Sequence, residues 1–314
     1  MSNDYWYRLL FKVKLYEVAG DSFQRLVNSV LGATFPGFQS IAPWGSQGDR
    51  GNDGWVRGQG RYFQVYGPKA SSSWKPVSAA KKAATDFAKL KTSCPDMRHY
   101  TFVLNDRFDG IPAPVVQCLN DLKSTGQVDE ADAMGAAAQT DMFMALPDDR
   151  RMEITGGVPS DTLTDLEPST LTEILKHLAD KDTAIPSAGE PVAPDFEEKI
   201  AFNGLPDTIA ARLKTNSYHI ADVDAFFEGR DTWIAETIAE ALRAIYTDCV
   251  RTVPDSHDEA PATRYGLLLE KMIPAVAKAH PHSLKAYRQA AEMVVAKYFE
   301  ACDVYEKPQP SDST

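Results

Sequence analysis

The sequence lacks both the cysteine spacing of a structural zinc site and the long apolar run of a membrane span. Its four cysteines lie far apart and form no CxxC pair. We therefore expect reduced thiols in a cytoplasmic protein. No segment approaches the ~18 apolar residues that a membrane helix needs. Residues 1–14 mix charged with apolar side chains and lack a small-residue cleavage site, which is not typical of a signal peptide.

Positive charge is also scarce, because 33 Lys and Arg face 44 Asp and Glu and leave a net charge of −11. The deficit is uneven: residues 1–124 carry 16 basic and 10 acidic side chains, whereas residues 125–314 carry 17 and 34. A basic N-terminal half can follow a phosphate backbone while an acidic C-terminal half contacts protein. The alternative explanation of this asymmetry is chance together with the ordinary demands of solubility.

The motifs of several enzyme classes are missing as well. The chain contains no GxxxxGK[ST] loop, and its glycines at 54, 58 and 60 precede no helix. No Ser/His/Asp or Cys/His set stands out among the six scattered histidines. A nucleotide-binding or phosphate-transfer enzyme therefore finds little support.

Hydrophobic periodicity in the first half predicts a mixture of strands and helices. The run YRLLFKVKLYE has a strand-like alternation, and the aromatic segment RYFQVYG is typical of a strand. The other predicted strands lie at 38–44, 55–58 and 99–106, and the predicted helices at 20–37, 78–92 and 113–125. This order predicts an α/β sandwich, a mixed central sheet flanked by helices, over residues 1–124.

From residue 129 onward the pattern changes to one helix after another. Thr170 and Glu173 form a capping box at the start of one of them. The segment 182–199 holds three prolines and is typical of a linker. We therefore predict a helical connector over 125–190, an all-α domain over 191–308 and a disordered tail over 309–314.

The stretch GDRGNDGWVRGQGRYFQVYGPK, residues 48–69, places a carboxylate in a glycine-rich turn and an amide within an apolar strand. Asp53 and Gln64 supply oxygen ligands of the kind that Mg²⁺ prefers, and Mg²⁺ needs few protein ligands because it keeps several waters. A nearby lysine then steadies the charge that develops on phosphorus. The alternative is a hairpin in which the acids and glycines serve the turn and Gln64 is merely hydrogen-bonded.

These segments resemble the restriction-endonuclease-like PD-(D/E)xK superfamily, and most closely its branch with an Asp followed by Gln-x-Lys. Asp53 matches the Asp and Gln64 the Gln, but Tyr66 stands where the lysine is expected. The resemblance implies a DNA endonuclease that uses Mg²⁺ or Mn²⁺ held by Asp53 and Gln64. Its lysine would be Lys69 or, failing that, Lys75. The supporting residues would be Glu17 or Gln24 from the first helix, with Asp49 and Tyr66, and the contacts to double-stranded DNA would come from Arg50, Arg57, Lys81, Lys82 and Lys89.

The C-terminal segments VDAFFEGRDTWIAETIAEALRAIYTDCV and AYRQAAEMVVAKYFEACDVYEKP are similar to the shared C-terminal domain of ABC-three-component systems, the Lamassu-type defence family. The resemblance implies an antiphage effector held inactive by an SMC-like ATPase and a small middle component. Release and self-association into a homo-oligomer would switch on cleavage, with no membrane involved. The alternative is a non-catalytic adaptor whose nuclease core is degenerate.

Overall fold

The computed structural model describes residues 3–41, 52–69, 75–159, 168–181, 196–280, 282–301 and 304–306. The predicted site residues Asp49 and Arg50 lie outside these ranges. The chain divides into two compact units, Ser2–Thr155 and Gly156–Thr314.

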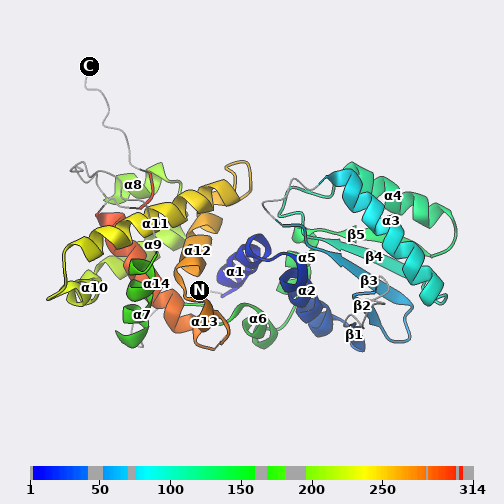
Figure 1. The fold of residues 1–314 in the computed structure, drawn as a ribbon, viewed down its shortest axis with the longest axis horizontal. Coiled ribbons are helices and arrows are strands. Elements are labelled where there is room, and N and C mark those ends of the chain that lie inside the picture. The colour runs from blue at the N-terminus through cyan, green and yellow to red at the C-terminus, as the bar shows by residue number, and fades with distance from the viewer. Residues whose placement is uncertain are drawn as a thin grey trace, which may run out of the picture. The chain divides into compact units, whose positions relative to one another are not determined.

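The N-terminal unit is built on a mixed sheet that has five strands among the described residues (Figure 1). The strands follow one another across the sheet in chain order: β1 Phe38–Ser40, β2 Gly54–Val56, β3 Arg61–Tyr66, β4 His99–Leu104 and β5 Glu130–Met134. The pairs β1–β2 and β2–β3 are antiparallel, whereas β3–β4 and β4–β5 are parallel. Helices connect the parallel strands, as such crossovers require.

Helices cover both faces of this sheet. On one face lie α3 (Pro76–Ser93) and α4 (Ala113–Ser124), whose apolar residues pack on Tyr62, Tyr100 and Phe102. On the other face lie α2 (Gly20–Thr34) and α5 (Ala136–Met144), with α1 (Asp4–Glu17) against α5 and α6 (Asp148–Thr155) against α1 and α2. This is the predicted arrangement of a mixed sheet among helices.

Two elements differ from the sequence prediction. Residues 4–17 form the helix α1, although the run from Phe11 to Leu15 alternates apolar and basic residues. The prediction of a strand was wrong because Trp6, Leu9, Leu10 and Val13 also recur at helical spacing, and all four are buried.

The strand β5 was missed, because Glu-Ala-Asp-Ala-Met has none of the β-branched or aromatic residues that favour strands. Its pairing with β4 places β5, α5 and α6 in the same unit as the rest of the sheet. That unit therefore ends at Thr155, beyond the boundary at residue 124 that the sequence suggested.

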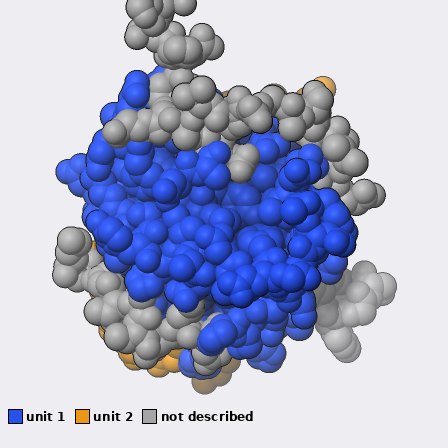
Figure 2. All heavy atoms as spheres, turned by 90° about the vertical axis from the view of Figure 1, so that its left-hand side faces the viewer, with its two compact units in different colours: residues 1, 156–314 blue, residues 2–155 orange. Residues whose placement is uncertain are grey.

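The C-terminal unit, coloured blue in Figure 2, contains only helices among its described residues (Figure 1). These are α7 Pro168–Ala179, α8 Phe196–Phe202, α9 Asp207–Ser217, α10 Ile220–Phe227, α11 Trp233–Thr252, α12 Ala260–Met272, α13 Ala275–Lys278 and α14 Leu284–Glu300. The helix α14 is central, because α7, α9, α10 and α12 all pack against it. Its polar residues are paired rather than exposed: Glu292 accepts two hydrogen bonds of 2.6 Å from Arg212, and Arg288 donates one of 2.6 Å to Glu270.

Candidate active site

Asp53 lies immediately before β2 and is held by the neighbouring strand and by α2. Its carboxylate is 3% exposed and accepts hydrogen bonds of 2.6 Å from the Val65 backbone N–H and from Gln24 Nε2. Its own backbone N–H donates to the Phe63 carbonyl at 3.1 Å. A carboxylate has about four lone-pair positions, so these contacts fix Asp53 without exhausting its capacity as a ligand.

Gln64 is equally buried, in the middle of β3, but its amide is poorly satisfied. Alternation along the strand places it on the same face as Tyr62 and Tyr66, which pack in the cluster beneath α3. Its Oε1 has no hydrogen-bond partner among the described residues, and its Nε2 reaches the Val65 carbonyl only at 3.5 Å. A buried amide in this condition costs free energy unless a ligand completes its hydrogen bonding.

The two side chains make their described contacts with different layers, since Asp53 binds α2 and Gln64 faces α3. Burial raises the pKa of Tyr100 well above its usual value, and the nearby carboxylates of Asp86 and Asp53 raise it further. The Tyr100 ring lies in the α3 cluster, and its hydroxyl donates to the Ala83 carbonyl of that helix at 3.0 Å. The backbone N–H and the carboxylate of Asp53 bond to Phe63 and Val65, the residues on either side of Gln64, so Asp53 lies alongside the middle of β3.

A lysine that the sequence placed among the DNA contacts lies close to Tyr66. The Lys82 ammonium is 5.9 Å from the centroid of the Tyr66 ring and 2.6 Å from Asp86 Oδ2. Asp86 is 5% exposed and also lies 3.6 Å from the Lys89 ammonium. The resemblance to the nuclease superfamily leads us to expect a lysine at position 66, and Lys82 brings an ammonium group near Tyr66 from another element.

Sequence reasoning missed Asp86 altogether. The signal that could have found it is the spacing Lys82-x-x-x-Asp86, an i,i+4 pair on a predicted helix. What the sequence does not reveal is that this pair lies against the sheet, where Asp86 is buried, rather than on a solvated face.

The remaining predicted residues lie on the surface. Lys69 follows β3, Lys75 immediately precedes α3, and both are exposed. Arg57 is exposed in the turn after β2, as are Lys81 and Lys89 on α3. Glu17 is the exposed last residue of α1, so of the two residues suggested for the helix, Gln24 is the one whose contact with Asp53 is observed.

Two observations limit the ligands and partners of this unit. The described residues contain no group of three or more His, Cys, Asp or Glu side chains that could hold a metal ion. A cation here would therefore rely on few protein ligands, as Mg²⁺ does. Residues 1–155 carry 18 basic and 17 acidic side chains. The net positive charge of residues 1–124 is thus almost cancelled within the structural unit to which they belong.

The C-terminal unit has a recognisable family signature. Residues 169–306 match C-terminal domain 10 of the ABC-three component (ABC-3C) systems. The match to this domain, CTD10, begins in α7 and extends past α14, so it covers the helices of the C-terminal unit. No curated protein and no solved structure matches the chain.

The ending YFEACDVYE is the more specific part of the resemblance, and the structure describes its residues 298–301 and 304–306. Lys199 of α8 is 1% exposed, and its ammonium donates to the carbonyls of Phe299 at 2.8 Å and Val304 at 2.7 Å. Val304 and Tyr305 are buried, and Tyr305 packs 4.3 Å from Tyr246 between ring centroids. These residues pack at one end of the helical core.

None of the helices that the structure describes is long and apolar enough to cross a membrane.

Proposed function

We propose that the N-terminal unit is a metal-dependent DNA endonuclease and that the CTD10 segment couples it to the other components of an antiphage ABC-3C system. The observation that carries the catalytic part is the buried Oε1 of Gln64, which has no partner among the described residues, in a strand whose neighbouring residue Val65 bonds the buried carboxylate of Asp53. An apolar strand has no structural need for such an amide, and a ligand would satisfy it.

The donor chemistry of these residues fits a hard divalent cation. Asp53 offers carboxylate oxygens and Gln64 an amide oxygen, which are the ligands that Mg²⁺ and Mn²⁺ prefer. When bound, such an ion would activate a water molecule and neutralise charge on the scissile phosphate. The hydrogen bonds from Gln24 and the Val65 N–H keep the Asp53 carboxylate in one orientation, so Gln24 acts as a positioning residue.

Lys82 is the best candidate for the basic residue of this site. Its ammonium lies over the ring of Tyr66, whereas Lys69 and Lys75 are exposed. Asp86 holds the Lys82 ammonium at 2.6 Å and so fixes its position. A fixed ammonium in this place would stabilise the negative charge that develops on the phosphate during hydrolysis.

The regulatory part of the proposal rests on the CTD10 match and on the resemblance that the sequence shows. An SMC-like ATPase and a small middle component would hold the effector inactive, and release with self-association would allow cleavage of double-stranded DNA. The acidic character of residues 156–314, with 27 Asp and Glu against 15 Lys and Arg, suits protein contacts rather than DNA contacts.

A second candidate function is a non-catalytic adaptor. Two observations favour it: Tyr66 replaces the motif lysine, and the N-terminal unit has almost no net positive charge with which to attract DNA. In that case the α/β unit would bind a partner, and no assembly state of the protein would cleave DNA.

Cleavage of supercoiled plasmid separates these functions. The purified chain and the complex assembled with its partner components are incubated with Mg²⁺, with Mn²⁺ or with EDTA. We expect metal-dependent cleavage that Asp53→Asn and Lys82→Ala each slow by at least about 100-fold. Lys69→Ala and the matched α3 variant Lys81→Ala should stay within about threefold of wild type, because exposed lysines contribute only to phosphate contacts.

Full activity in Asp53→Asn would contradict the assignment of Asp53 to the active site. Loss of activity in Lys69→Ala, with Lys82→Ala unaffected, would show that Lys69 and not Lys82 is the basic residue of the site. An absence of cleavage by both the chain and the complex would leave the adaptor function.

A further inference from the structure

The loop that follows β4 carries a half-buried arginine whose hydrogen bonding is incomplete. The Arg107 guanidinium donates one hydrogen bond, from Nη2 to the Pro68 carbonyl at 2.7 Å. Its Nε is buried without a hydrogen-bond partner, and the side chain forms no ion pair with the described residues. A guanidinium has five N–H donors and stays charged in proteins. Most of the donors of Arg107 therefore lack an acceptor among the described residues.

The backbone of this loop is strained and is held in place on both sides. Arg107 and Phe108 have φ angles of 48° and 68°, in the left-handed region that residues with large side chains rarely adopt. Asn105 is fully buried and donates to two carbonyls at the end of α1, at 2.9 and 3.0 Å. Asp106 accepts the N–H of the first residue of α5 at 2.7 Å. Strain of this kind persists only where surrounding contacts enforce it, and it is frequent at ligand-binding sites.

The loop lies at the edge of the sheet where the parallel strands β3, β4 and β5 end. In open α/β sheets, ligands bind beside the carboxyl ends of the parallel strands. The helices α3, α4 and α5 each follow one of these strands, so all three begin near this edge. The positive ends of their dipoles favour negative charge there.

The charged side chains around Arg107 leave a small positive excess. Two are acids of the same loop: Asp106, which is bound to α5, and Asp109. Burial lowers the pKa of Arg107, and the charge of Asp109 opposes that lowering. Lys12 lies over the ring of the residue after Arg107, and Lys69 follows the carbonyl that Arg107 binds. Three cations thus face two carboxylates, which favours an anionic ligand.

Arg107 is also close to the candidate active site along β3. Asp53 accepts the N–H of Val65, whereas Arg107 binds the carbonyl of Pro68. Three residues of chain span at most about 11 Å. A polyanion bound at Asp53 through a metal ion would therefore extend to the neighbourhood of Arg107.

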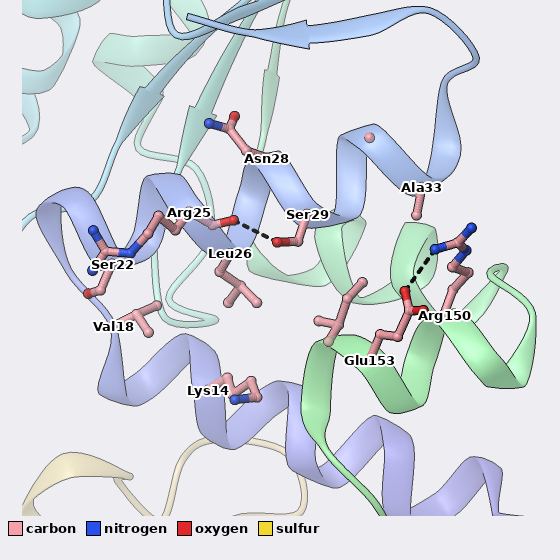
Figure 3. A pocket seen from close by; sticks show the side chains of 12 residues that line it. Lys14, Val18, Ser22, Arg25, Leu26, Asn28, Ser29, Ala33, Arg150 and Glu153 are labelled. Carbon is pink, nitrogen blue, oxygen red and sulfur yellow. Dashed lines mark hydrogen bonds and ion pairs between the residues drawn. The ribbon is translucent and has the colours of Figure 1, made fainter. Parts of the chain in front are cut away.

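The cavity of about 620 Å³ between α1, α2 and α6 offers no comparable group (Figure 3). The guanidinium groups of Arg25 and Arg150 lie at opposite ends of it, and Arg150 is paired with Glu153 at 2.8 Å. The cations of this cavity do not converge on one ligand.

We propose that Arg107 binds a phosphate group of the DNA substrate, beside the phosphate that is cleaved. The identity of this ligand rests on the proposed nuclease function. A planar guanidinium fits two oxygens of one phosphate at once. The strained loop holds the guanidinium in place before DNA binds, so little side-chain freedom is lost on binding.

Fluorescence anisotropy of a labelled DNA duplex with the full chain in EDTA tests this proposal, because the proposed metal-dependent cleavage cannot occur there. Arg107→Ala should weaken binding about tenfold, the loss expected for one charge-assisted contact. It should also reduce the slope of log affinity against log salt concentration by about one. Arg107→Lys should keep the slope and lose only part of the affinity, since it keeps the charge but not the planar fork.

Arg98→Ala is the matched control, because Arg98 lies at the other end of β4 and pairs with Asp129 at 2.7 Å. Its affinity for DNA should stay within about twofold of wild type. Circular dichroism of each variant establishes that a loss of binding does not reflect unfolding.

Wild-type affinity in Arg107→Ala, an equal loss in Arg98→Ala, or no DNA binding by the wild type would overturn the proposal. Binding of inorganic phosphate that depends on Arg107, with DNA affinity independent of it, would also overturn it and assign the site to a free anion. Arg107-dependent DNA binding without cleavage in any metal would support the phosphate site and contradict only the proposed catalysis.

Discussion

Gln64 is the residue whose environment is hardest to explain by packing alone. It sits in β3 between two tyrosines of an apolar cluster, it is 3% exposed, and its Oε1 is unpartnered among the described residues. A side chain retained only for stability would be expected to have its hydrogen bonds completed. A ligand site is the simplest physical reason for this arrangement.

This reasoning predicts opposite effects of one substitution on stability and on function. Gln64→Met keeps the side-chain length and removes the unsatisfied amide, so we expect unfolding free energy to stay within about 1 kcal/mol of wild type or to rise. Metal-dependent cleavage should be lost in the same variant. Urea denaturation measures the first quantity. A destabilisation of more than about 2 kcal/mol would indicate that the amide is part of the protein's own hydrogen bonding.

Gly67 controls how closely α2 approaches β3. A Cβ at this position would lie 2.8 Å from Phe23 Cβ and 2.7 Å from its ring, and Phe23 is fully buried next to Gln24. We expect Gly67→Ala to cost about 1–3 kcal/mol through overpacking and to slow cleavage by loosening the Gln24–Asp53 contact. Gly32→Ala is the matched control within α2, because its Cβ would meet only one atom at 3.7 Å. Thermal unfolding should show a lower Tm for Gly67→Ala and a Tm for Gly32→Ala that is equal to or above that of wild type.

At the scale of elements, the sequence predicts best where one pattern dominates. The aromatic and β-branched content of RYFQVY and HYTFVL identifies β3 and β4, and the apolar spacing in α2 identifies that helix. Residues 4–17 carry both the strand and the helix period, and burial decides between them only after folding. The residues of β5 have little intrinsic strand preference, and this segment forms a strand through its parallel pairing with β4.

For the candidate site too, the sequence identifies some residues from a local pattern and cannot identify others. Asp53 and Gln64 are visible in the sequence because a carboxylate in a turn and an amide in an apolar strand are unusual. The contacts of Gln24 with Asp53 and of Lys82 with Tyr66 join residues 29 and 16 positions apart. No local pattern encodes such contacts, since they depend on which helix covers which part of the sheet.

One pair of helices in the CTD10 segment carries a pH dependence of stability. Lys271 of α12 donates to Asp248 of α11 at 2.5 Å, and this hydrogen bond lowers the pKa of Asp248 below its ordinary 3.8. A carboxylate with a lowered pKa in the folded state stabilises the fold above its ordinary pKa, and the contribution is lost as the pH falls through the folded pKa.

We therefore expect Asp248→Asn to be less stable than wild type at pH 7, with the difference shrinking as the pH falls below about 3.8. Urea unfolding of both proteins across this range measures it. A difference that stays constant or grows in acid would show that the charge of Asp248 is not what joins the two helices.

At the scale of the whole molecule, charge is distributed differently from what the sequence suggested. Dividing the chain at residue 124 gives a basic first part, but the structural boundary at Thr155 adds an acidic segment and leaves that unit nearly neutral. Any attraction of DNA must therefore come from local groups of cations rather than from the charge of the unit as a whole.

For the C-terminal unit, by contrast, the residue range predicted from the sequence is close to the range of the family match. The helical pattern predicted over 191–308 and the segments that carry the ABC-3C resemblance overlap the CTD10 match at 169–306 almost completely. The match begins earlier than predicted because α7 packs on α11 and α14 and so belongs to the same helical core.

The central claim is that Asp53 and Gln64 bind the same divalent cation, and Mn²⁺ binding tests it independently of any activating partner. Electron paramagnetic resonance of the purified chain titrated with Mn²⁺ counts bound ions directly. We predict one site per chain in the wild type that is lost in Asp53→Asn and in Gln64→Met, both variants remaining folded by circular dichroism. Equal Mn²⁺ binding by all three proteins, or no binding by the wild type, would contradict the claim.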